Sequence, residues 1–78
     1  MDRLADICER LDICMIEDCA HTMGASWRNR RSGNFGKSAA FSTQTYKHMN
    51  SGEGGFLTTN DPVVAARAVV SSGSYMLY

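Results

Sequence analysis

A lysine that follows a short apolar segment is the residue in this chain best suited to covalent chemistry. Lys47 stands five residues after Ser42, where the apolar run 38–42 ends, and the glycine cluster 52–55 follows it. A buried strand that ends in this way can deliver an amine to a pocket beside a flexible turn. The alternative is a solvated loop lysine, because an ammonium is rarely buried without a partner.

An acidic pair supplies the second half of the predicted site. Glu17 and Asp18 directly follow the apolar run 13–16, and in open α/β sheets ligands bind beyond the carboxyl ends of the strands. Asp18 is therefore a candidate to point into a site. The alternative is that its carboxylate only caps the turn 19–22 by accepting from free backbone N–H groups.

The elements that must position these side chains alternate between helix and strand. The spacing of Leu4, Ile7, Cys8 and Leu11 predicts an amphipathic helix over 2–11. The nearly continuous apolar run predicts a strand over 13–17 that is buried on both faces, as in a parallel sheet. We further expect a loop or small hairpin over 19–36, a strand over 38–42, a lysine-bearing loop over 43–53, a strand over 54–59 and a helix over 61–71 that starts at Asn60-Asp61-Pro62.

Composition limits the possible functions. With 78 residues, 44% of them hydrophobic, and a formal charge of zero, the chain is one small unit with a thin core and has no net field to attract nucleic acid or an anionic membrane. No apolar run reaches the ~20 residues of a membrane span, so we expect a cytoplasmic protein. Arg28, Arg30 and Arg31 form a local basic cluster that we expect in a solvated loop.

Three cysteines without a CxxC spacing indicate reduced thiols, two of which we expect to face the core. A zinc-binding unit can be drawn from Cys14, Cys19, His21 and His48, but these ligands lack the paired spacing of zinc sites. We therefore predict no metal site. A non-catalytic α/β interaction module stays open as a further alternative.

Several short motifs keep a fixed order along the chain. They are Ile-Glu-Asp-Cys-Ala-His at 16–21, then Gly24, Gly33, Gly36, Phe41-Ser42, Lys47 and Gly-Glu-Gly-Gly at 52–55. Together they resemble the central block of the DegT/DnrJ/EryC1/StrS aminotransferases. The resemblance implies a homodimeric, fold-type-I enzyme that depends on pyridoxal 5'-phosphate and transfers an amino group, mostly to nucleotide-linked keto-sugars. It also implies that these 78 residues are an α/β fragment of the large domain, with three strands and flanking helices.

The same resemblance assigns roles to four residues. Lys47 matches the Schiff-base lysine, which binds the cofactor and moves the substrate proton, and Asp18 matches the carboxylate that pairs with the pyridine nitrogen. Ser42 matches a serine near the cofactor phosphate. His21 matches a histidine or glutamine close to the ring, and simple packing is its alternative role.

Several residues depart from the family pattern. Other residues are common at Thr43-Gln44-Thr45-Tyr46, where Tyr46 is bulky beside the lysine, and at His48 and Cys19. These departures weaken the inference about the substrate more than the inference about the cofactor. Lys47 itself argues against the sugar dehydrases among the relatives, which carry histidine there. Because the upstream phosphate-binding segment, the small domain and the partner's residues have no counterpart here, we expect no turnover from these residues alone. The apolar tail 74–78 leads us to expect further chain, and a degenerate remnant is the alternative.

Overall fold

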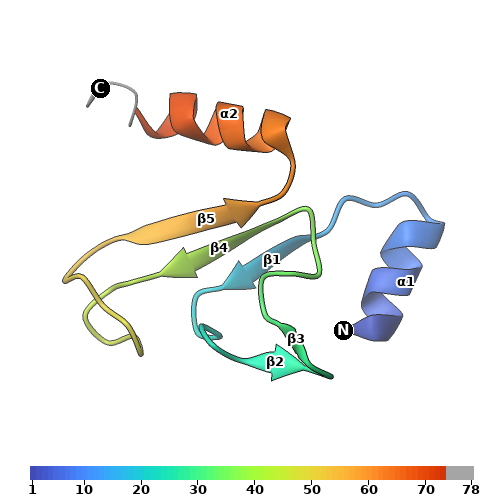
Figure 1. Cartoon of the computed structure of the whole chain (residues 1–78), viewed down its shortest axis with the longest axis horizontal. Coiled ribbons are helices and arrows are strands. Elements are labelled where there is room, and N and C mark those ends of the chain that lie inside the picture. The colour runs from blue at the N-terminus through green and yellow to red at the C-terminus, as the bar shows by residue number, and fades with distance from the viewer. Residues whose placement is uncertain (74–78) are drawn as a thin grey trace.

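The chain folds around a three-stranded sheet, with one helix before it and one after it (Figure 1). The computed structural model describes residues 1–73, so the tail 74–78 and the expectation attached to it lie outside the described residues. In chain order the elements are α1 (Asp2–Arg10), β1 (Ile16–Cys19), β2 (Ser26–Trp27), β3 (Arg30–Arg31), β4 (Ser38–Ser42), β5 (Gly55–Thr59) and α2 (Pro62–Ser72). This arrangement confirms a small α/β unit. Within the described range no helix is long and apolar enough to cross a membrane.

The strand order β1-β4-β5 places the predicted site strand β4 in the middle of the sheet. β1 runs parallel to β4, with Ile16 opposite Ser38 and Asp18 opposite Ala40, and β5 runs antiparallel to β4. Side chains alternate between the two faces of a strand. Asp18, Ala40 and Ser42 therefore share one face, whereas Glu17 and Cys19 lie on the other.

The buried core is small. Among the described apolar residues only Cys19 and Ala39 are buried, joined by the polar Ser38. The expectation that the run 13–16 is buried on both faces is wrong for this chain, because Ile13 is 53% and Ile16 is 68% exposed. β1 pairs with a parallel neighbour as expected, but it lies at the edge of the sheet, and the face that carries Ile16 and Asp18 is exposed.

The end of α1 explains why the first strand begins later than predicted. The N–H of Ile13 donates to Cys8 O at 2.8 Å and the N–H of Asp12 donates to Glu9 O at 3.3 Å, while Asp12 takes a φ of 54°. This is a Schellman motif with aspartate in the left-handed position that glycine usually takes. Residues 13–15 connect this motif to β1 without regular secondary structure, so the strand covers Ile16–Cys19 rather than 13–17.

The amphipathic face of α1 stays largely uncovered. Leu4, Ile7 and Leu11 are each about half exposed or more, and Cys8 is half-buried. The pattern therefore predicted the helix, which is one residue shorter than expected, but the described chain does not bury its apolar stripe. Two of the three cysteines were expected to face the core, but only Cys19 is buried, and Cys14 is exposed.

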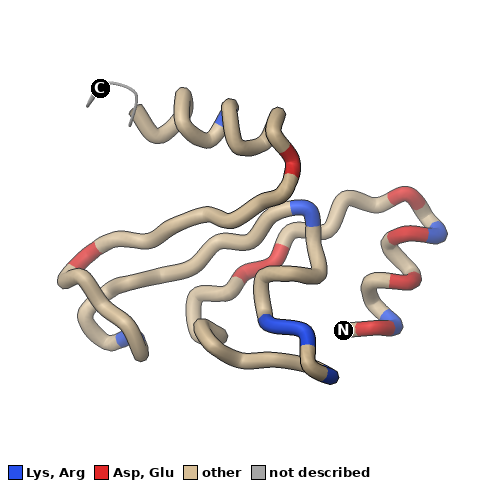
Figure 2. The backbone as a smooth tube through the Cα atoms, viewed as in Figure 1, with Lys and Arg blue, Asp and Glu red and all other residues tan. Residues whose placement is uncertain are grey.

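The segment between β1 and β4 contains the small hairpin that we considered. β2 and β3 pair antiparallel across a turn in which Arg28 and Asn29 have positive φ. Figure 2 shows the basic cluster on this hairpin, and all three arginines are exposed. Arg28 donates to Asp2 at 3.0 Å, which links the hairpin to the start of α1.

Candidate functional site

Lys47 lies in a compact loop beyond the carboxyl end of β4. Its N–H donates to Gln44 O at 3.0 Å, and Ser51 N donates to Thr43 O at 2.8 Å. Two hydrogen bonds from side-chain hydroxyls complete the loop: Thr43 Oγ1 and Ser51 Oγ lie 2.9 Å apart, and Thr45 Oγ1 donates to Gly52 O at 2.7 Å. Lys47 therefore lies in a loop that is held together by hydrogen bonds rather than in an unstructured one.

The glycine cluster after Lys47 allows this loop to close. Gly52 has a φ of 85° and Gly54 a φ of 143°, both in regions that L-residues with a side chain rarely adopt. The N–H of Thr43 donates to Gly54 O at 3.0 Å, so the chain returns directly into β5. The expected conformational role of the cluster is confirmed.

His21 is the nearest polar partner of the lysine. Lys47 Nζ lies 3.2 Å from Nε2 and 3.3 Å from Nδ1 of His21. The in-plane lone-pair directions of the two ring nitrogens diverge, so one ammonium cannot lie along both. The amine therefore forms one hydrogen bond with the ring, and the tautomer of His21 decides which nitrogen accepts it.

Ser42 joins these two residues in one small cavity. The cavity measures about 180 Å³ and is lined by Ala20, His21, Met23, Ser42, Tyr46, Lys47 and His48. Ser42 Oγ accepts from Gln44 N at 3.3 Å, which leaves the hydroxyl hydrogen to donate to an acceptor in the cavity. Three of the four predicted site residues are thus brought together.

Asp18 lies on the same sheet face as Ser42 but outside the lining of this cavity. It is exposed at the end of β1, and its Oδ1 accepts from Ala20 N at 3.1 Å. This hydrogen bond is the capping interaction that we considered as the alternative. It occupies one carboxylate oxygen and leaves Oδ2 open, so capping and ligand binding are compatible.

Of the departures from the family pattern, Tyr46 and His48 lie at the cavity and Cys19 does not. Tyr46, 91% exposed, and His48 both line the cavity. Cys19 is buried on the opposite face, where its Sγ lies 3.1 Å from Ser32 Oγ, which in turn lies 2.6 Å from Thr22 Oγ1. The unusual cysteine is therefore a core residue and not a cavity residue.

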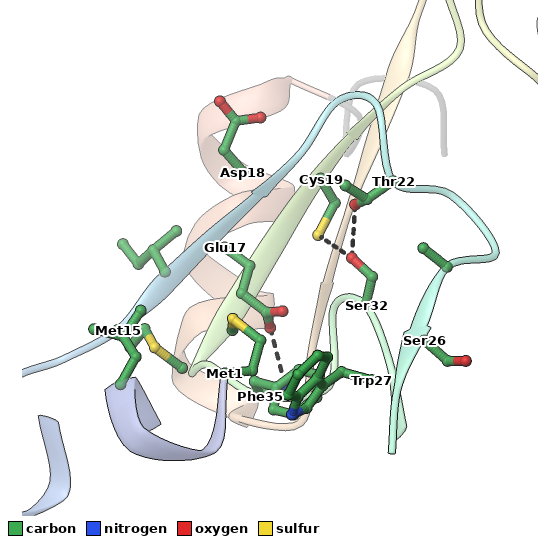
Figure 3. Close-up of a pocket in the computed structure, with 13 residues that line it drawn as sticks. Met1, Met15, Glu17, Asp18, Cys19, Thr22, Ser26, Trp27, Ser32 and Phe35 are labelled. Atoms are coloured by element: carbon green, nitrogen blue, oxygen red, sulfur yellow. Dashed lines mark hydrogen bonds between the residues drawn. The ribbon is translucent and has the colours of Figure 1, made fainter. Parts of the chain in front are cut away.

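The other face of β1 borders an apolar pocket of about 390 Å³ (Figure 3). Trp27, Phe35, Met1 and Met15 line it, and Glu17 projects into the same region. Figure 3 shows Asp18 directed to the opposite side of β1 from Glu17 and Cys19. The acidic pair in the sequence is thus divided between two faces of the sheet.

Glu17 is the residue whose role the sequence did not indicate. Its carboxylate accepts from three backbone N–H groups, those of Gly33 at 3.0 Å, Phe35 at 2.9 Å and Gly36 at 2.8 Å. Partial burial raises the pKa of Glu17, but the three N–H groups and the charge of Arg30 outweigh burial and hold the pKa below its ordinary value. The only local signal was an acidic residue directly after an apolar run, with Gly33 and Gly36 further along the chain.

The zinc alternative finds no support in the described chain. Within residues 1–73 no group of three or more His, Cys, Asp or Glu side chains could hold a metal ion. Cys14 is exposed and Cys19 is engaged with Ser32 in the core.

The chain belongs to the DegT/DnrJ/EryC1/StrS aminotransferase family, whose model matches residues 1–74. It is 47% identical over 68 residues to the L-glutamine:2-deoxy-scyllo-inosose aminotransferase of Micromonospora echinospora, covering 87% of this chain and 16% of that protein. An L-glutamine:scyllo-inosose aminotransferase of Streptomyces griseus is also 47% identical over 68 residues, with the same coverage. The GDP-perosamine synthase of Caulobacter vibrioides is 38% identical over 76 residues, covering 97% of this chain and 20% of that protein. The chain thus spans a fifth or less of the length of these relatives.

Proposed function

We propose that this chain forms the cofactor-binding centre of the large domain of an aminotransferase that depends on pyridoxal 5'-phosphate. The observation that carries the proposal is the contact between Lys47 and His21 in a cavity that also contains the Ser42 hydroxyl. A lysine held against a histidine at the end of a central strand is suited to bind an aldehyde and to move a proton. Family membership supports the same assignment.

The side chains around the cavity fit the chemical groups of this cofactor. The Ser42 hydroxyl can donate to a phosphate oxygen, and the amine of Lys47 can bind the aldehyde carbon. The open carboxylate oxygen of Asp18 can accept from a protonated pyridine nitrogen, and it lies on the same sheet face as Ser42. The cofactor, when bound, supplies an electron sink for the carbanion formed at the substrate.

Each of the four predicted site residues then has a defined task. With the cofactor bound, Asp18 would hold a proton on the ring nitrogen by charge, and Ser42 would orient the phosphate end. The Lys47 amine, once the substrate's amino group had displaced it from the aldehyde carbon, would take a proton from the substrate carbon and return it, while His21 would keep that amine in the cavity. The remaining walls of such a site come from other segments, since the 180 Å³ cavity is open to solvent beside the exposed Tyr46 and His48.

A keto group on a polyhydroxylated ring is the acceptor that we propose. The names of two relatives describe amination of inososes with L-glutamine as the donor, and a third describes a GDP-linked amino-sugar. The identities are higher for the inosose enzymes than for the GDP-sugar enzyme, which favours a cyclitol or sugar ketone over a requirement for a nucleotide. We also infer from the family that the parent enzyme is a cytoplasmic homodimer.

Covalent labelling tests the proposal with a built-in control. Lys37 and Lys47 are the only lysines of the chain, and Lys37 pairs with Asp61 at 3.3 Å. The chain is incubated with pyridoxal 5'-phosphate, reduced with borohydride and digested, and the modified peptides are quantified. We expect label at Lys47 in excess over Lys37 and Met1, and loss of the excess in Lys47→Arg. Equal labelling of all three amines contradicts a formed site.

An interaction module without catalysis is the second candidate, favoured by the hydrogen bond from Ala20 to Asp18. Asp18→Asn separates the two functions, because an asparagine oxygen can still cap the turn but carries no charge for the ring nitrogen. The aminotransferase proposal expects weaker labelling of Lys47 with unchanged folding. The module expects no change in labelling.

A further inference from the structure

Segment 33–36 brings the start of β4 against the start of β1. The N–H of Lys37 donates to Met15 O at 2.8 Å. A Cβ at Gly36 would lie 2.5 Å from Met15 O, so the two backbones approach as closely as glycine allows. Glu17 adds the three hydrogen bonds to Gly33, Phe35 and Gly36.

These contacts act where the pairing of the two strands begins. The parallel register Ile16 with Ser38 sets every later pair, including Asp18 with Ala40. A slip of one residue turns each side chain of a strand to the other face. In a slipped register Asp18 would leave the face of Ser42, and Glu17 would take its place.

We propose that Glu17 is a positioning residue whose carboxylate fixes the register of β1 on β4 and so keeps Asp18 on the sheet face that carries Ser42. This proposal rests on the proposed function in one respect, namely that Asp18 binds the cofactor. Its geometric part, the fixed register, stands on the three hydrogen bonds alone.

A glutamate suits this task better than its amide. A carboxylate offers two acceptor oxygens and no donor to the three N–H groups. Glutamine keeps the shape but turns an NH₂ group toward at least one of those donors. Arg30 of β3 is the charged group that acts on this carboxyl, and Asp18 points away from it.

The experiment compares Glu17→Gln with Glu9→Gln in the 78-residue chain. Glu9 is an exposed residue of α1, so its variant loses the same charge away from the strands. Amide hydrogen exchange is measured at Gly33, Phe35 and Gly36, and nuclear Overhauser contacts between the backbones of Asp18 and Ala40 report the register. We expect Glu17→Gln alone to lose protection at the three amides and to weaken the register contacts. A folded Glu17→Gln chain with intact contacts overturns the proposal.

Two further readouts keep the result decisive. If Glu17→Gln does not fold, the wild-type chain is titrated with acid instead, and the chemical shifts of the amides of Gly33, Phe35 and Gly36 are followed. We expect the three chemical shifts to change together and the register contacts to weaken over the same pH range. Contacts that persist after those amides have titrated overturn the proposal. The ratio of cofactor label at Lys47 to that at Lys37 is expected to fall several-fold in Glu17→Gln and not in Glu9→Gln. Absence of Lys47 preference in the wild-type chain would count against the proposed function, while the register contacts still test Glu17.

Discussion

The side-chain nitrogen of Lys47 lies within hydrogen-bond distance of the imidazole of His21, 3.2 and 3.3 Å from its two nitrogens. The two residues are separated by 26 positions in the sequence and come from the ends of neighbouring parallel strands. The ring therefore limits where the amine can point. A residue that the family resemblance placed near the cofactor ring thus contacts the lysine itself in this chain.

Replacing His21 by alanine should weaken the preference of pyridoxal 5'-phosphate for Lys47. A hydrogen bond between side chains contributes ~0.5–1.5 kcal/mol, which corresponds to a change of about two- to twelvefold in the population of the positioned amine. The measurement is the ratio of borohydride-fixed label at Lys47 and Lys37. His48→Ala is the matched control, since His48 lines the same cavity but has no hydrogen bond to Lys47 among the described residues. Equal ratios in both variants would show that the contact does not hold the amine.

Stability should fall with acid because of Glu17. Its pKa in the folded chain lies below the ordinary value of 4.5, so at acid pH the unfolded chain binds more protons than the folded chain. The stabilisation is complete above the ordinary value and is lost as pH falls through the lowered pKa. Denaturant midpoints followed by circular dichroism between about pH 6 and about pH 3 measure this slope. Glu17→Gln should flatten it, and Glu9→Gln should not.

Part of the pH dependence of stability should remain in Glu17→Gln because of Asp61. Its pKa is also lowered, by the N–H groups of Val64 and Val63 and by Lys37. Stability linked to Asp61 therefore has the same sign and the same acid window. A slope in Glu17→Gln as steep as in the wild-type chain would mean that Glu17 is not the carboxylate at work.

The close approach at Gly36 predicts a steric cost for alanine. The added Cβ would meet Met15 O at 2.5 Å, a backbone atom that cannot rotate away. Overpacking of this kind costs about 1–3 kcal/mol of unfolding free energy. Gly24→Ala is the control, because nothing lies within 4 Å there and only its φ of 83° is unfavourable. We expect equilibrium denaturation to rank Gly36→Ala below Gly24→Ala, and the opposite order would contradict the packing.

The parts of the fold that the sequence predicted well have local signals. Strand 38–42 is a run of small and apolar residues that follows Gly36-Lys37 and precedes the polar segment 43–45. Its predicted bounds match β4. Pro62 after a capping aspartate marks the start of α2 within one residue. The lysine-bearing loop follows from the glycines at 52 and 54, whose positive φ values only glycine adopts easily.

The parts that failed depend on contacts between distant residues. Asp12 in the left-handed conformation ends α1, and nothing in a pattern of apolar residues distinguishes it from the start of a strand. Glu17 is satisfied by amides 16 to 19 positions away. Ile16 and Leu57 are exposed because no element of the described chain covers them. Hydrophobic periodicity predicts an apolar face but does not report whether another element covers it. The roles of Asp18, His21, Ser42 and Lys47 at a cofactor stay a prediction.

The three cysteines should react with thiol reagents in the order of their exposure. Cys14 is exposed, Cys8 is half-buried, and Cys19 is 2% exposed with its Sγ against Ser32. A thiol that is buried reacts only when the chain opens. Mass spectrometry of timed alkylation should show Cys14 modified first and Cys19 last, with Cys19 accelerated by denaturant. Early modification of Cys19 would mean that the small core is not formed.

Asp61 should decide whether the first turn of α2 forms. Its Oδ1 accepts from Val63 N at 2.8 Å and Val64 N at 3.2 Å, and Pro62 occupies the first helical position. Asp61→Ala removes both acceptors, so amide exchange at these two residues should speed up and helical signal should fall. Asp61→Asn keeps a side-chain oxygen for the cap and should preserve most of the protection.

Lys37→Gln separates the cap from the ion pair at the same residue. The pair between Lys37 Nζ and Asp61 Oδ2 spans 3.3 Å and is partly exposed, so it contributes little to stability. We expect the exchange rates at Val63 and Val64 to stay near those of the wild-type chain in this variant. If Lys37→Gln exposes these amides as much as Asp61→Ala does, the lysine charge rather than the carboxylate cap holds the start of the helix.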